Sequence, residues 1–186
     1  MLPGYPLVLA SASADGAALT NTLTATSIMP ASAMATIPAG ALQIGSLLKI
    51  TLRGRISTVV TTPGTLTLDL RVGGVIVSAF GAMALNVNAQ TNAHWEATIM
   101  AVVRSTGIGT AATMMATADF ISRAVIGSAA AGAGGAGELM LPDTAPAVGT
   151  GFNSSLALPV DVFATWSVAN AANSIQTHQA LVELKV

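Results

Sequence analysis

Apolar and polar residues alternate along several segments of this chain with the period of two that is typical of β-strands. Apolar residues at even positions alternate with Lys, Thr and Arg through residues 48–57. The alternation resumes through residues 66–72, after the sequence TTPG at residues 61–64. Two alternating runs on either side of a Pro-Gly turn predict an antiparallel hairpin. The pair Gly73-Gly74 predicts a second turn, into a strand over residues 75–80.

Four later segments alternate in the same way and are predicted to be strands: residues 95–105, 112–123, 160–168 and 179–186. The side chains expected to face the core are Trp95, Ala97, Ile99, Ala101 and Val103, then Val162, Ala164 and Trp166, and finally Ala180, Val182, Leu184 and Val186. The phase of the last strand differs from that of Ile175 and Thr177. This change predicts a bulge or bend near His178.

Weaker strand signals precede residue 40, at residues 6–10, 19–28 and 34–37. With about eight strands or more, frequent turn signals and no helical period, the chain is predicted to be all-β, as a sandwich or a barrel. The sequence SAAAGAGGAG over Ser128–Gly137 predicts a low-complexity loop. A length of 186 residues without a repeat or a linker favours one domain.

Charged residues make up only 8% of the chain, against about 25% in an ordinary globular protein. The seven Lys and Arg residues and eight Asp and Glu residues give a net charge of -1. Because the basic residues are scattered singly, the sequence shows no basic run for nucleic-acid binding. A surface with so little charge favours association, so we expect a subunit that covers part of its surface with other chains.

Three patterns suggest chemistry at first sight. Gly132, Gly134 and Gly137 form G-x-G-x-x-G, but a dinucleotide site requires that this fingerprint opens a helix. The pair His94 and Glu96 matches the H-x-E of zinc deaminases, which also require cysteine ligands, and the chain has no cysteine. No G-x-S-x-G elbow accompanies the serines. None of these patterns supports a catalytic, cofactor or metal site.

The carboxylates fall mostly at outward positions of the predicted strands, and none has a sequence neighbour that would form a catalytic acid–base pair. These carboxylates are Asp69, Glu96, Asp119, Asp161 and Glu183. The sequence therefore predicts that the chain is not an enzyme, and no catalytic, cofactor-binding or metal-binding residue is assigned.

Four basic residues share the polar side of the predicted hairpin: Lys49, Arg53, Arg55 and Arg71, with Asp69 beside them. Two interpretations stay open. The side chains could pair with acidic residues across the strands, or they could form a docking face for an acidic partner surface.

Three segments resemble a group of structural proteins from the virions of tailed bacteriophages. They are LLKITLRGRISTVVTTPGTLTLDLRVGG, HWEATIMAVVRSTG and TWSVANAANSIQTHQALVEL, and the resemblance covers roughly residues 40–186. It implies a jelly-roll-like antiparallel β-sandwich over residues 41–186. Residues 1–40 lie outside it and are interpreted as an extended N-terminal arm with short strands, suited to reach a neighbouring subunit.

The resemblance also implies a role. We expect a virion protein, assembled in the host cytoplasm, that decorates or cements a capsid as a homo-oligomer, with a trimer favoured. Its partners would be the major capsid protein or other virion proteins, with no nucleic acid, membrane or cofactor. The alternative is a receptor-binding or carbohydrate-binding module of a tail or head fibre. Such sugar sites usually carry exposed aromatic residues, whereas Trp95 and Trp166 are expected to face inward.

Overall fold

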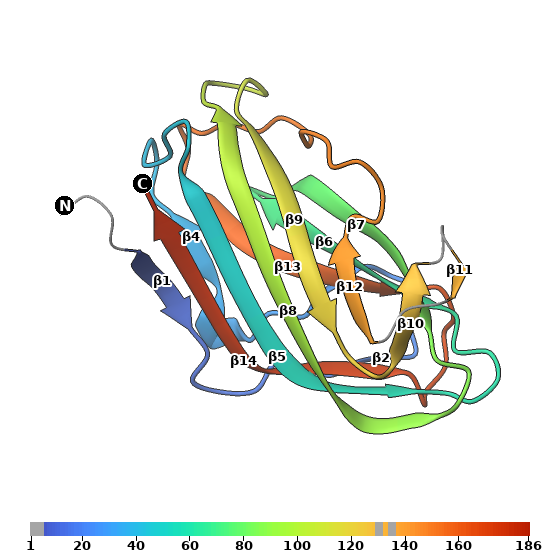
Figure 1. Cartoon of the computed structure of the whole chain (residues 1–186). Helices are drawn as coiled ribbons and strands as arrows, with labels where there is room; N and C mark the ends of the chain where they lie inside the picture. Colours follow the sequence, from blue (N-terminus) through green and yellow to red (C-terminus); the bar gives the residue numbers. More distant parts are fainter. Residues whose placement is uncertain (1–5, 129–131, 134–136) are drawn as a thin grey trace.

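The protein, seen in a computed structural model that describes residues 6–128, 132–133 and 137–186, is a sandwich of two antiparallel β-sheets (Figure 1). The predicted all-β sandwich is therefore confirmed. The jelly-roll connectivity expected from the resemblance stays a prediction.

Seven strands form sheet 1 in the described part of the chain. Their spatial order is β1 (Leu7–Ser11), β14 (Ser174–Lys185), β5 (Leu47–Thr58), β8 (Gln90–Ser105), β9 (Thr113–Ile121) and β12 (Glu138–Leu141), and β2 (Leu19–Thr20) also pairs with β14.

Sheet 2 packs against sheet 1 and also has seven strands among the described residues. Their order is β11 (Gly132–Ala133), β10 (Val125–Ser128), β7 (Val75–Leu85), β6 (Thr65–Val72), β13 (Leu158–Trp166) and β3 (Thr26–Ser27), and β4 (Ala35–Ile37) also pairs with β13. A single turn of 3₁₀ helix, η1 (Ala31–Ala33), precedes β4.

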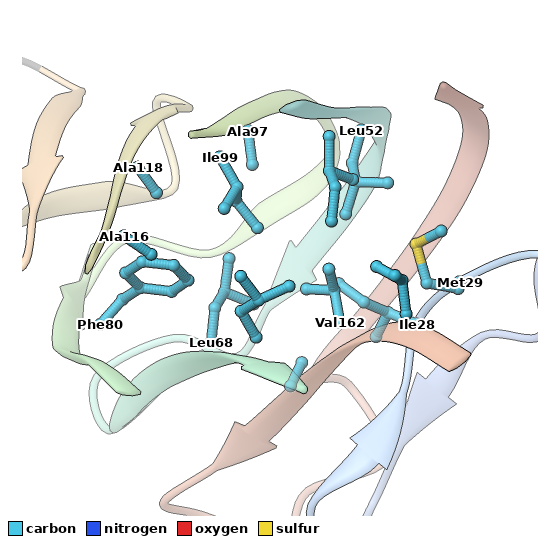
Figure 2. Packing of buried hydrophobic residues seen from close by; sticks show 14 of the residues in the cluster. Ile28, Met29, Leu52, Leu68, Phe80, Ala97, Ile99, Ala116, Ala118 and Val162 are labelled. Carbon is cyan, nitrogen blue, oxygen red and sulfur yellow. The ribbon is translucent and has the colours of Figure 1, made fainter. Parts of the chain in front are cut away.

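The core lies between the two sheets, because each strand turns its apolar side inward. Figure 2 shows side chains from both sheets meeting there, among them Ile99 of β8 and Leu68 of β6. The ring of Trp95 stacks on Phe120 with 5.7 Å between centroids and an interplanar angle of 7°. Trp95 and Trp166 have exposed fractions of 0% and 1%, so the predicted inward positions of both tryptophans are confirmed.

The predicted hairpin of residues 48–57 and 66–72 is wrong. Strand β5 pairs with β14 and β8 in sheet 1, whereas β6 pairs with β7 and β13 in sheet 2. The segment between them therefore carries the chain from one sheet to the other. Alternation shows which side of a strand faces the core, but a hairpin and a crossing between sheets share that alternation.

The second predicted turn is confirmed, since Gly73 and Gly74 join β6 to β7 with φ of +64° and +81°.

The register of β14 shifts between Thr177 and Gln179, which confirms the bulge predicted near His178. Beyond it, Ala180, Val182 and Leu184 are buried as expected. Val186 is 40% exposed and lies outside the strand, so its predicted inward position is wrong.

The N-terminal segment forms short strands, as predicted, but residues 7–37 belong to the sandwich. Strands β1 and β2 extend sheet 1 beside β14, and β3 and β4 extend sheet 2 beside β13. Ile28, Ala33 and Ile37 from this segment lie in the common core. The division into an arm over residues 1–40 and a sandwich over residues 41–186 is corrected accordingly for the described residues.

Candidate interaction surface

The outer face of sheet 1 carries basic residues of β5 that pair with acids on the neighbouring strands. Arg53 donates from Nε to Glu96 Oε2 at 2.9 Å and from Nη2 to Glu96 Oε1 at 3.1 Å. Lys49 Nζ lies 3.9 Å from Glu183 Oε2 on β14. For these two residues the cross-strand pairing interpretation is confirmed.

Arg71 does not share this face, because β6 lies in sheet 2. Its guanidinium bonds to Asp69 at 2.7 Å on the same strand and covers the ring of Phe163 on β13, with 3.6 Å from Cζ to the ring centroid. The predicted four-residue basic face is therefore corrected. Lys49, Arg53 and Arg55 stay together on sheet 1, and Arg71 faces the opposite side of the molecule.

Two hollows adjoin on the outer face of sheet 1. One of about 230 Å³ is lined by Arg53, Arg55, His94 and His178, together with Gly54 and Gln179. A second of about 430 Å³ is lined by Arg55, His94 and Arg123, together with Asn92, Ala93, Ile121 and Ser122. Because Arg55 and His94 line both hollows, we treat them as one surface. The "basic trough" is defined by Arg53, Arg55, His94, Arg123 and His178.

Strand irregularities shape this surface. The bulge in β14 places His178 beside β5. A second register shift between Ile56 and Thr58 disturbs the pairing of β5 with β8, where the Asn92 N–H donates to Ser57 Oγ at 3.0 Å. Such bulges change the direction of outward side chains along a sheet.

The charges of the trough are unevenly paired. The hydrogen bond and the charge of Glu96 raise the pKa of Arg53 above its ordinary value. His178 Nδ1 lies 3.0 Å from Asp15 Oδ2. Within the described residues, Arg55 and Arg123 form no ion pair with a carboxylate, and both are exposed. Two arginines of the trough are therefore available to an external anion.

Sequence reasoning identified Arg53 and Arg55 as candidates but missed the other members of the trough. His94 lies directly opposite Arg55 in the register of β5 and β8. Arg123 follows β9, and His178 lies at the bulge of β14. Only the bulge near His178 had a signal in the sequence. The closeness of His94 and Arg123 to Arg55 depends on strand pairing, which alternation does not reveal.

A second polar cluster lies on the outer face of sheet 2. Asp161 of β13 is opposite Arg71 of β6, and Asp69 lies on the same side of β6. Ser27 Oγ donates to Asp161 Oδ1 at 2.6 Å. Burial raises the pKa of Asp161, while the Ser27 bond and Arg71 partly oppose that rise. Asp69 and Asp161 are far apart in sequence, so this proximity was not predicted.

The remaining sequence motifs can be located only in the described residues. Within the tract Ser128–Gly137, residues 129–131 and 134–136 lie outside the described residues. Gly134 of the glycine pattern is one of them. Glu138–Leu141, directly after it, is a strand, whereas a dinucleotide fingerprint requires a helix. Glu96 of the H-x-E pattern is bonded to Arg53. No group of three or more potential metal ligands occurs among the residues searched, which are the described ones.

Three loop segments without a charged residue, residues 38–46, 106–112 and 144–157, lie at one end of the sandwich (Figure 1). The third segment is part of the connection from β12 to β13, which carries Asp143 before it. Each loop exposes a large aliphatic side chain: Ile44 at 72%, Ile108 at 77% and Leu156 at 57%. We call these three loops the uncharged end.

Hydrogen bonds join the loops of the uncharged end to one another. Gly40 N–H donates to the Ser154 carbonyl at 3.0 Å, and Ser154 N–H donates to the Gly107 carbonyl at 3.0 Å. Gly107 N–H in turn donates to Ser154 Oγ at 2.9 Å. The three aliphatic side chains are therefore presented on a connected scaffold.

Comparison with protein-family models, curated proteins and solved structures found no match to this chain. Within the described residues, no helix is long and apolar enough to cross a membrane.

Proposed function

We propose that this chain is a structural subunit that assembles with copies of itself and decorates or cements the capsid of a tailed bacteriophage. The uncharged end carries the assembly part of this proposal. Exposed apolar patches commonly mark sites of protein association, and the centres of protein interfaces are depleted in charged residues. Ile44, Ile108 and Leu156 combine both properties on loops that are bonded together.

An interface of ordinary size would cover only a small part of the surface of this chain. The chain has an accessible surface of 8413 Å². A standard specific interface buries about 800 Å² on each partner, on the order of a tenth of this surface. The resemblance of residues 40–186 to phage virion proteins supports the capsid setting and favours a trimer.

The proposal assigns no catalysis to the chain. Several carboxylates already have intramolecular partners: Asp15 with His178, Asp69 with Arg71, Glu96 with Arg53, Asp161 with Ser27 and Glu183 with Lys49.

The alternative of a carbohydrate-binding fibre module has less support. Both tryptophans are buried, and the ring of Phe163 is covered by Arg71, so these rings are not free to stack on a sugar.

Light scattering after size exclusion tests the assembly proposal. We expect a mass of about three times 18.5 kDa for the wild-type chain. The double substitution Ile44→Asp and Ile108→Asp should give the single-chain mass, because it places charge at the uncharged end. The matched control, Leu23→Asp with Val87→Asp, changes exposed aliphatic residues outside the three loops and should keep the oligomer. A wild-type chain that stays monomeric at high concentration would refute assembly through this end, as would equal masses for the two doubles.

The phage setting has its own test. Quantitative mass spectrometry of purified virions from the source of this sequence should find the chain at a fixed ratio to the major capsid protein. Its absence from the particles would exclude the decorating role while leaving the solution assembly intact.

A further inference from the structure

The basic trough gathers a large share of the basic side chains of the chain. The sequence has seven Lys and Arg residues and two His residues. The trough contains three of the arginines and both histidines. From this concentration we infer that the trough binds an acidic polypeptide segment of a neighbouring protein. The inference rests on the proposed function in one respect only, namely that the acidic segment belongs to a neighbour in the assembly.

The two unpaired arginines define the chemistry of the ligand. A guanidinium presents a planar fork of N–H donors that matches the two oxygens of a carboxylate. Arg55 and Arg123 are exposed and form no ion pair within the described residues. A carboxylate that approaches them displaces no intramolecular acid.

The shape of the trough favours a segment of chain over a single ion. The two hollows share Arg55 and His94 and together cross β14, β5, β8 and the end of β9. Their volumes of about 230 and 430 Å³ leave room for more than one acidic side chain. An extended peptide with spaced carboxylates could reach Arg55 and Arg123 together.

Acidic groups at the trough favour spaced carboxylates over a continuous polyanion. Glu96 is bonded to Arg53, and Asp15 is bonded to His178. These carboxylates repel an evenly charged phosphate backbone, whereas a peptide can place neutral residues beside them. Nucleic-acid sites often contact about six to ten phosphates, more than the three arginines here could neutralise.

The backbone beneath the trough is held in place. Trp95 Nε1 donates to the carbonyls of Arg55 and Gln176, each at 3.2 Å. Ser122 Oγ donates to the His94 carbonyl at 2.8 Å. These bonds tie Arg55 and His94 to the sandwich, so the peptide would meet a preformed surface.

Fluorescence anisotropy with a fluorescein-labelled peptide of alternating Gly and Glu tests this inference at low ionic strength. We expect saturable binding to the wild-type chain. Arg55→Glu and Arg123→Glu should each weaken it about tenfold or more, because like charges then face each other. The matched control, Arg104→Glu, reverses an exposed arginine on the same sheet but outside the trough, and should change affinity by about twofold or less.

Three results would overturn the inference: no saturable binding, an equal loss in Arg104→Glu, or tighter binding of oligothymidylate or inorganic phosphate than of the peptide. Light scattering of the wild-type chain used for the binding measurement separates this inference from the proposed function. Peptide binding by a chain that is monomeric refutes only the assembly through the uncharged end. A wild-type chain that assembles but does not bind the peptide refutes only the role of the trough.

Discussion

Gly54 on β5 lies directly opposite Trp95 on β8, and the space that a side chain at Gly54 would need is already occupied. A Cβ atom at Gly54 would lie 2.9 Å from Trp95 Nε1 and 1.9 Å from the carbonyl oxygen of Gln176 on β14. The indole N–H donates to that same carbonyl and to the carbonyl of Arg55. The missing side chain therefore allows the buried Trp95 to bond to β5 and, beyond it, to β14 beneath the basic trough.

Substitution Gly54→Ala should lower the free energy of unfolding by about 3 kcal/mol, because an overpacked core must shift backbone or break these bonds. Urea denaturation followed by tryptophan fluorescence measures the change. Gly16→Ala is the control, since its Cβ would lie no closer than 3.4 Å to any atom and should cost less than about 1 kcal/mol. Similar losses for the two variants would show that the close approach at Gly54 is unimportant.

The fold class and the inward faces of most strands could be predicted because burial imposes alternation residue by residue. The inward faces around Ile99, Val162 and Val182 follow directly from that pattern. Strand neighbours could not be predicted in the same way. Residues 59–64 carry turn residues that suit a hairpin, yet they lead β5 in sheet 1 to β6 in sheet 2.

The candidate surface was only partly predictable for the same reason. Arg53 and Arg55 are on the outward phase of one strand, which alternation reveals. Arg123 reaches them only through the pairing of β9 with β8 and of β8 with β5. A hairpin of residues 48–57 and 66–72 would place Arg71 beside them, whereas β6 lies in sheet 2. Pairing depends on contacts between distant segments, and a single sequence does not display those contacts.

Asn173 should be the main side-chain anchor of the crossing between the sheets. It is fully buried, its Oδ1 accepts the N–H of Val59 at 2.9 Å, and its Nδ2 donates to the carbonyl of Pro63 at 3.1 Å. Asn173→Ala leaves these buried groups without partners, so we expect a loss of about 3 kcal/mol in the free energy of unfolding. Urea denaturation provides the measurement.

Asn170→Ala in the same loop is a suitable control for this prediction. Asn170 Oδ1 accepts only a local, exposed bond from Ala172 N–H at 2.8 Å. Its loss should cost about 1 kcal/mol or less. If Asn173→Ala were no more destabilising than Asn170→Ala, the crossing would be held by its backbone alone.

Asp161 should make the stability of the sandwich depend on pH. It is partly buried on the outer face of sheet 2, and burial raises its pKa above the ordinary value of 3.8. The folded chain therefore keeps this proton at pH values where the unfolded chain has lost it. Because the folded state then binds more protons, the contribution of Asp161 to stability falls as the pH rises above about 3.8.

Asp161→Asn removes this titration while leaving an oxygen that can accept the bond from Ser27 Oγ. The free energy of unfolding of the variant relative to the wild type should therefore rise with pH above about 3.8 and become constant once Asp161 has ionised in the folded wild type. Urea denaturation at a series of pH values from about 3.5 to about 7 measures this difference. Ser27→Ala should extend the wild-type decline to higher pH, because it removes a bond that favours the ionised form. A difference between Asp161→Asn and the wild type that stays constant or falls with pH would contradict the raised pKa.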